Sequence, residues 1–178
     1  MANSSKPPKR LSASDITQQY LKERLHYDPE TGVFTWRSLP YKNQRKPGDV
    51  AGSYNSDGYR VIVLGNRIFG AHRLAWLYMT GKWPPSEMDH INRIRDDNRW
   101  CNLRLAERWQ NTSNTGVPSN NRAGIKGVRK MNDRWQARIR HKHVTVHLGT
   151  FDTPELARAA YEAAAIELKG DFAGVQPR

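Results

Sequence analysis

The stretch MDHINRIRDDNRWCNLRLAERWQN, residues 88–111, places a carboxylate, an imidazole and several amides among many arginines. Asp89 and His90 are adjacent, and Asn102 and Asn111 follow His90 by 12 and 21 residues. Hydrolysis of a phosphodiester needs a base that activates water and positive charge that neutralises the phosphate. A neutral imidazole can be the base near neutral pH, and a divalent cation on hard oxygen ligands can supply the charge. The stretch is therefore either a metal-dependent phosphodiester-cutting site or a solvated basic loop and helix.

Asp89 and His90 would divide the work of such a site, because neighbouring side chains of an extended segment point in opposite directions. One would bind the metal and the other would activate water. Asn111 offers an amide oxygen, a neutral hard ligand that leaves coordination positions for phosphate and water. Asn102 could form a hydrogen bond across the turn and hold the loop that aims His90.

The order of the segments MDHIN, DDNRWCNLR and ERWQN resembles the HNH nuclease signature in its Asn-ending form, found in phage homing endonucleases. The resemblance continues upstream through YDPETGVFTW and GYRVIVLGNRIFGAHRLAWLYMTGKWPP. It implies a ββα-metal unit with Mg²⁺, or another divalent cation such as Mn²⁺, as cofactor. The implied roles are His90 as general base, Asn102 as the residue that orients it, and Asp89 and Asn111 as metal ligands.

Two of these roles have competitors in the sequence. Asn98 competes with Asn102, although the motif Asn-Leu-Arg favours Asn102. Asn114 competes with Asn111, although the dipeptide Gln-Asn after a helical segment favours Asn111.

Because the base must be neutral to accept a proton, we expect activity to fall below about pH 6.5.

Short helices and strands must position these residues. Residues 15–25 have apolar side chains at helical spacing, with Ser14 or Asp15 as the cap. His72 and Arg73 begin a second helix that Gly81 ends, and there packing or a phosphate contact is more natural than chemistry. The remaining expected elements are strands at 33–36, 59–64 and 67–70, with LGNR as the hairpin turn between the last two, and helices at 72–79 and 106–112.

The C-terminal third changes to a period of two. In RWQARIR, Trp135, Ala137 and Ile139 alternate with cationic or polar residues, and HVTVHLG alternates in the same way, with the valines at 144 and 146 on the apolar side. A helix follows from the cap Thr153 to Gly170, with Ala157, Ala160 and Ala164 as a stripe of small residues. These patterns predict a three-stranded antiparallel sheet with one helix on its apolar face and a bare cationic face.

Residues 124–172 resemble the APETALA2/ethylene-response-factor DNA-binding domain, through KGVR, WQARIR and HLGTFDTPELARAAYEAAA. The resemblance implies that the sheet enters the major groove of DNA. By alternation and by position, the residues expected to face DNA are Lys126, Arg129, Arg134, Arg138, Arg140 and His147. Arg138 and His147 replace a glutamate and a tryptophan that are common in the plant proteins, so the base preference does not transfer. A histidine metal site at His141, His143 and His147 is a weaker alternative.

The charge of the chain points to nucleic acid as partner, and the resemblance of residues 124–172 implies double-stranded DNA. The 178 residues carry a formal net charge of +12, which attracts polyanions. The sequence contains no run of about 18 apolar residues, so we expect no membrane-spanning segment. The segment MANSSKPPKR lacks the apolar core of a signal peptide. The single cysteine excludes internal disulfides. We expect a cytoplasmic monomer without a small-molecule substrate, and the resemblance implies a phage or prophage gene in a bacterial host.

The expected fold class is α+β, a ββα-metal nuclease domain followed by the small sheet domain. The expected domains are a disordered basic tail at 1–10, the lead-in and nuclease at 11–115, a linker at 116–123 and the DNA-binding domain at 124–174. Two further functions compete with a site-selective endonuclease. One is a DNA-binding transcriptional regulator with an inactive nuclease unit, and the other is an RNA-binding protein, which Trp135 on the apolar face disfavours.

Overall fold

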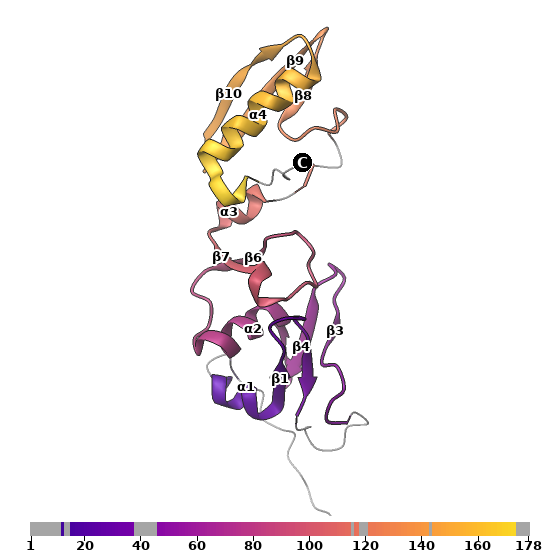
Figure 1. The fold of residues 1–178 in the computed structure, drawn as a ribbon, viewed down its shortest axis with the longest axis vertical. Helices are drawn as coiled ribbons and strands as arrows, with labels where there is room; N and C mark the ends of the chain where they lie inside the picture. The colour runs from indigo at the N-terminus through magenta and orange to yellow at the C-terminus, as the bar shows by residue number, and fades with distance from the viewer. Residues whose placement is uncertain are drawn as a thin grey trace, which may run out of the picture. The chain divides into compact units, whose positions relative to one another are not determined.

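The computed structural model describes residues 12, 15–37, 46–114, 116–117, 121–142 and 144–173. The tail predicted at 1–10, the candidate cap Ser14 and part of the predicted linker therefore lie outside the described residues. The chain divides into two compact units, Met1–Leu105 and Ala106–Arg178. Figure 1 shows small antiparallel sheets and few helices, so the α+β fold class is confirmed. No helix in the described ranges is both long and apolar enough to cross a membrane.

The first unit begins with a short helix and a hairpin. Helix α1 (Gln18–Arg24) leads directly into β1 (Leu25–Tyr27), which pairs antiparallel with β2 (Phe34–Trp36). The expected helix start at residues 14–15 is wrong, because Thr17 is the cap and accepts a hydrogen bond from the Tyr20 amide at 3.1 Å. Leu25 ends the helix because it becomes extended and pairs with Trp36.

The second part of this unit is a three-stranded sheet with a helix. The sheet contains β3 (Ser53–Tyr54), β4 (Arg60–Leu64) and β5 (Arg67–Gly70), and α2 (Ala71–Thr80) follows it. Gly65 and Asn66 have φ of 55° and 61°, as a two-residue type I′ hairpin turn requires. Gly81 ends α2 at a φ of 77°. Buried side chains from both helices and from β1, β2, β4 and β5 form one core, among them Leu21, Phe34, Ile62, Leu74 and Leu77.

The segment with the candidate site continues from this core. Strand β6 (Glu87–His90) and β7 (Leu103–Ala106) form a two-stranded sheet, and the 3₁₀ helix η2 (Trp100–Asn102) precedes β7. Helix α3 (Arg108–Ser113) then begins the second unit. The expected helix at 106–112 started too early, because Ala106 is the last residue of β7. The side chain of Glu107 forms a capping box with Gln110, and this starts the helix at Arg108.

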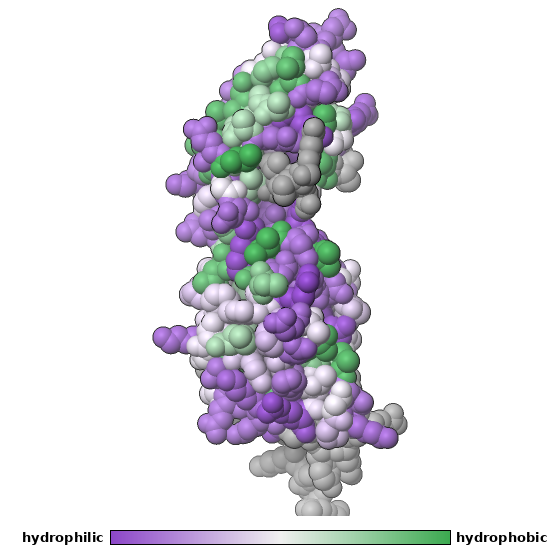
Figure 2. All heavy atoms as spheres, viewed as in Figure 1, coloured by the Kyte–Doolittle hydropathy of each residue, from purple (hydrophilic) through white to green (hydrophobic). Residues whose placement is uncertain are grey.

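The second unit contains the predicted sheet and helix. Its strands are β8 (Val128–Met131), β9 (Arg134–His141) and β10 (Val144–Phe151), in the order β10-β9-β8. Helix α4 (Pro154–Lys169) has Thr153 as its cap, and the 3₁₀ helix η3 (Gly170–Phe172) follows. Figure 2 shows hydrophobic residues gathered over α4, where Leu156 and Ile166 are exposed.

Two details of the second unit, one in α4 and one in β10, differ from the expected pattern. In α4, Ala157, Tyr161 and Ala165 are buried, whereas Ala160 and Ala164 of the predicted stripe are only half-buried, although Ala164 still packs against the core of this unit. Val144 and Val146 were expected on a covered apolar face, but both are exposed. A bulge between His147 and Gly149 shifts the register there, and the buried apolar residues lie nearer the centre of the sheet.

Candidate functional site

Strand β6 places Asp89 and His90 in a largely buried position, with each residue 6% exposed. Arg104, on the neighbouring strand β7, donates from Nε at 2.9 Å and from a terminal nitrogen at 2.6 Å to the same oxygen, Oδ2 of Asp89. The side chains of this ion pair are 15% and 7% exposed. The carboxylate predicted to bind a metal is thus held by a guanidinium that the sequence analysis did not single out.

The imidazole of His90 contacts Asn98. The distance from His90 Nε2 to Asn98 Oδ1 is 3.1 Å. The Asn98 amide nitrogen donates to the Asp96 carbonyl at 3.1 Å, so its oxygen is the atom that faces the ring. Because a carbonyl oxygen can only accept, Nε2 of His90 must donate, and the lone pair of the neutral ring lies on Nδ1.

Asn98 is itself fixed by the first hairpin. Asn98 is 1% exposed, and its main-chain carbonyl accepts a hydrogen bond from the Tyr27 hydroxyl at 2.7 Å. Burial raises the pKa of Tyr27 above its ordinary value, so this hydroxyl stays a neutral donor. Gly32, at a φ of 73°, packs against the backbone of Asn98 and Arg99, where a Cβ atom would collide. The first hairpin therefore holds Asn98, the residue that contacts the imidazole of His90, in place.

Asn102 holds the loop that follows His90. Its Oδ1 accepts from the Asn92 amide at 3.0 Å, and its Nδ2 donates to Asn92 Oδ1 at 3.0 Å and to the Asp97 carbonyl at 2.7 Å. Its own carbonyl accepts from the Ile91 amide at 3.0 Å. Hydrogen bonds led by those of Arg99 lower the pKa of Asp97 to about 2 and fix the end of the loop. The two competing asparagines thus have different contacts. Asn102 forms hydrogen bonds with the loop after β6, and Asn98 contacts the imidazole ring of His90.

His72 lies against the same ring. The His72 and His90 ring centroids are 5.4 Å apart with the planes at 73°, and Tyr59 is within 5.9 Å of both rings. Burial first, and then the charges of His90 and Arg73, lower the pKa of His72 to about 4. Its Nδ1 is buried with no hydrogen-bond partner in the described part of the chain. His72, which was expected to have a packing role, therefore packs directly against His90, the candidate base.

The second expected metal ligand, Asn111, lies in α3 and is half-buried. This helix belongs to the second unit and Asp89 to the first, so their meeting at one ion stays a prediction. Among the described residues, no three His, Cys, Asp or Glu side chains group together as a metal site. A carboxylate and an amide oxygen are nevertheless hard donors of the kind that Mg²⁺ and Mn²⁺ prefer. Asn114, the competitor, is buried at the end of α3.

The sheet of the second unit has the expected cationic face. In β9, Arg134, Arg138 and Arg140 are exposed, whereas Ala137 and Ile139 are buried towards α4. Trp135 packs with the apolar cluster that contains Val128, Ala137 and Ala157. The alternation predicted from the sequence is confirmed for this strand, and it puts the arginines on the face opposite to Ala137 and Ile139.

A row of hydrogen bonds crosses the cationic face. Arg129 Nε donates to Gln136 Oε1 at 2.7 Å, and Gln136 Nε2 lies 2.8 Å from His147 Nε2. Arg134 is engaged elsewhere, with the Thr150 carbonyl at 3.0 Å and with Asp152 at 3.1 Å. The row ties the side chains of three strands into one ordered surface.

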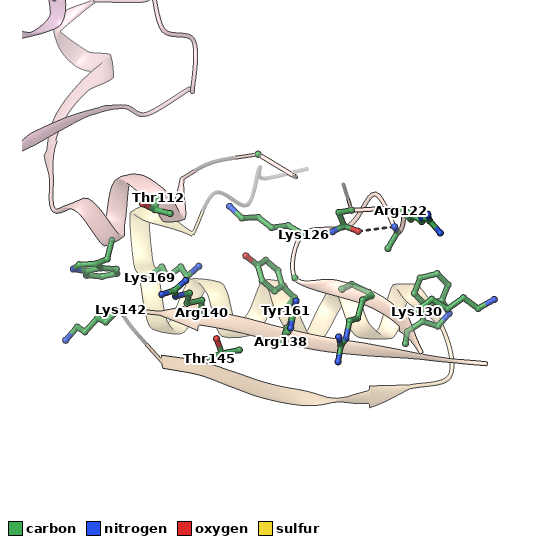
Figure 3. A pocket seen from close by; sticks show the side chains of 18 of the residues that line it. Thr112, Arg122, Lys126, Lys130, Arg138, Arg140, Lys142, Thr145, Tyr161 and Lys169 are labelled. Carbon is green, nitrogen blue, oxygen red and sulfur yellow. Dashed lines mark hydrogen bonds between the residues drawn. The ribbon is translucent and has the colours of Figure 1, made fainter. Parts of the chain in front are cut away.

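A cavity of about 1440 Å³ lies within the second unit, and Figure 3 shows Lys126, Arg138 and Arg140 among its lining residues. The alternative of a histidine metal site on one strand face is wrong for His141 and His147. A turn with Lys142 at a φ of 52° puts them on different strands, and His141 packs against Trp109 at 5.0 Å. His143 lies outside the described residues.

Comparison with known proteins assigns the two parts separately. Residues 69–113 match the family HNH_3, described as HNH endonuclease. A protein of Acanthamoeba polyphaga mimivirus, described as an uncharacterized HNH endonuclease, is 35% identical over 105 residues, which are 57% of this chain and 54% of that protein. The chain thus spans about half of this relative.

Two ethylene-responsive transcription factors of Arabidopsis thaliana match a C-terminal segment. One is 44% identical over 48 residues, 26% of this chain and 21% of the plant protein. The other is 47% identical over 47 residues, 25% of this chain and 19% of the plant protein. No solved structure matches the chain. One part of the chain is thus similar to HNH endonucleases, and a second part is similar to plant ethylene-responsive transcription factors.

Proposed function

We propose that this chain is a metal-dependent DNA endonuclease that hydrolyses phosphodiester bonds with His90 as the base. One observation carries the proposal. Within the segment that matches HNH endonucleases, His90 is held through Nε2 by a buried amide oxygen, which leaves Nδ1 as the proton acceptor. A structural histidine on a solvated loop would not need this arrangement.

Each neighbour has a part in the proposed reaction. Nδ1 of His90 takes a proton from the attacking water, while Asn98 keeps the ring in the required tautomer. Asn102 holds the loop after β6, so the base does not move away from its water. Asp89 and Asn111 would hold Mg²⁺ or Mn²⁺. When bound, the cation supplies positive charge for the phosphate and the leaving oxygen.

The C-terminal sheet would hold the DNA. We assign Lys126, Arg129, Arg138, Arg140 and His147 to contacts in the major groove, where arginine can bond to guanine through two nitrogens. Exposure of the β9 arginines and the ordered row from Arg129 to His147 support this assignment. Arg134 is a weaker candidate because Thr150 and Asp152 already engage it. The proposal includes a monomer that acts in the cytoplasm of a phage-infected bacterium, and sedimentation on DNA would test the stoichiometry.

A transcriptional regulator without nuclease activity is the second candidate, favoured by the matches to plant transcription factors. Incubating supercoiled plasmid with the protein and Mg²⁺, with and without a chelator, separates the two. We expect nicked or linear products that the chelator abolishes. The His90→Ala variant should bind the same DNA and fail to cut it. Plasmid that stays intact with wild-type protein under all divalent cations tested would favour the regulator.

A further inference from the structure

Arg104 is the charged group nearest to the candidate metal ligand that the proposed reaction leaves without a role. It lies on β7, two residues after Asn102, and it faces β6 across the two-stranded sheet. Its Nε and one terminal nitrogen donate to Oδ2 of Asp89, at 2.9 and 2.6 Å. With side chains 15% and 7% exposed, this pair is shielded from water and from salt.

This arrangement conflicts with a purely supporting role. A guanidinium and a divalent cation compete for the same carboxylate, because both are attracted to its negative charge. A neutral donor could orient Asp89 without that competition, in the way that neutral Asn98 orients His90. Orientation of Asp89 alone therefore does not explain why a positively charged side chain, that of Arg104, contacts it.

The geometry of arginine suggests the reason. Its planar fork of N–H donors matches the oxygens of a phosphate as well as those of a carboxylate. If Asp89 gives its negative charge to a metal, it attracts the guanidinium of Arg104 less, and a second anion nearby would stabilise that charge. In the proposed function, which this inference rests on, the anion next to Asp89 is the phosphate to be cut.

We propose that Arg104 is a second phosphate-neutralising cation of the active site, held on Asp89 in the metal-free protein and transferred to the phosphate when metal and DNA bind. The exchange couples the two ligands. Arg104 opposes metal binding in the absence of DNA, and it favours metal binding once the phosphate takes over the guanidinium. No bond is made or broken in this step.

The test compares Mn²⁺ affinity with cleavage. Isothermal titration measures Mn²⁺ binding to wild-type protein and to Arg104→Met, with and without a non-cleavable phosphorothioate duplex. Without DNA, we expect the variant to bind Mn²⁺ roughly tenfold more tightly, because the competitor is gone. With the duplex, the wild-type affinity should rise and the variant affinity should not. Cleavage by the variant should fall about 100-fold, in kcat rather than in KM.

Arg158→Met is the control. Arg158 forms an equally close pair, at 2.6 Å, with Glu162 on α4, away from the residues proposed to act in the reaction. Its loss should leave the Mn²⁺ affinity unchanged. Arg104→Lys keeps a charge without the fork, so it should bind Mn²⁺ like the wild type and cleave more slowly. Arg104→Gln supplies the neutral comparison if the methionine variant does not fold.

Two failures are distinguishable. If wild-type protein does not cut DNA with any divalent cation, the proposed function is wrong. If the wild type cuts but loss of Arg104 leaves Mn²⁺ affinity unchanged or lowers it, Arg104 only positions Asp89, and the inference of a transferred cation is overturned.

Discussion

At the scale of single residues, the hydrogen-bonding state of His90 depends on Asn98. The Asn98 oxygen lies 3.1 Å from Nε2, and its amide nitrogen is committed to Asp96 at 3.1 Å. A change that removes this acceptor frees the ring to rotate and to carry its proton on the other nitrogen. The lone pair would then spend less time directed at the water.

We predict that Asn98→Ala lowers the single-turnover rate of plasmid cleavage by about 100-fold. Asn98→Asp keeps an acceptor towards His90 and should lose less. A purely structural role would instead lower the thermal midpoint of both variants and leave the pH–rate profile in place. Wild-type rates in folded Asn98→Ala protein would contradict the assignment of the tautomer.

His72 predicts a pH dependence of stability. Burial lowers its pKa from 6.5 to about 4, so the unfolded chain takes up a proton below pH 6.5 that the native protein refuses until about pH 4. The stability that the neutral ring contributes is therefore complete above pH 6.5 and is lost as the pH falls towards 4. The loss is about 3 kcal/mol over this window. Urea unfolding at pH 7.5 and 4.5 measures it, and His72→Phe should show a flatter dependence.

Some site residues could be predicted from spacing and others could not. Asp89 and His90 stand out because an acid next to an imidazole in a strand divides two chemical roles. The motif Asn-Leu-Arg favoured Asn102 over Asn98 as the residue that orients His90, and only coordinates show that the amide of Asn98 is the one that reaches the ring. Arg104 was missed because the pairing of β6 with β7 brings it to Asp89, and no local pattern marks that contact.

At the scale of elements, short sequence motifs predicted the turns and helix ends that depend only on neighbouring residues. The hairpin turn at Gly65 and the cap Thr153 both follow from single residues with a fixed conformational preference. The start of α1 was wrong because several adjacent residues can cap a helix, and hydrogen-bond geometry chose Thr17. The exposed valines of β10 depend on a bulge and on how much of the sheet α4 covers, which the period of two does not contain.

Gly127 provides a prediction about the sheet unit. It has a φ of 72°, and a Cβ atom there would overlap the Tyr161 ring and approach the Arg138 carbonyl. We expect Gly127→Ala to destabilise the second unit by about 3 kcal/mol or more and to weaken DNA binding with it. Gly124→Ala is the matched control, because φ is 64° but nothing lies within 4 Å of its Cβ position. That variant should lose only about 1 kcal/mol.

Thermal unfolding of each variant, followed by tryptophan fluorescence, measures the difference. Equal losses at the two glycines would mean that backbone strain alone decides the cost, and that the close packing of Tyr161 on Gly127 contributes nothing.

At the scale of the whole molecule, the net charge of +12 suits the proposal that both parts of the chain act on DNA. A polycation of this kind binds DNA of any sequence through counterion release, so charge alone gives affinity without selectivity. The order of the side chains on the sheet, rather than their number, would then select a site. The two contributions can be separated by the salt dependence of binding, because phosphate contacts change the slope and base contacts change the preference.

Arg140 tests this separation. It is exposed on the cationic face of β9 and lines the cavity beside Lys126. If it contacts phosphate, Arg140→Gln should weaken binding of every duplex about equally and reduce the slope of log affinity against log salt by about 1. If it reads a base, the slope should stay and one position of the preferred site should relax. Arg158→Gln, which removes an arginine paired with Glu162 on α4, should change neither quantity. Fluorescence anisotropy with labelled duplexes over a salt series decides, and an unchanged affinity in Arg140→Gln would place DNA somewhere other than this face.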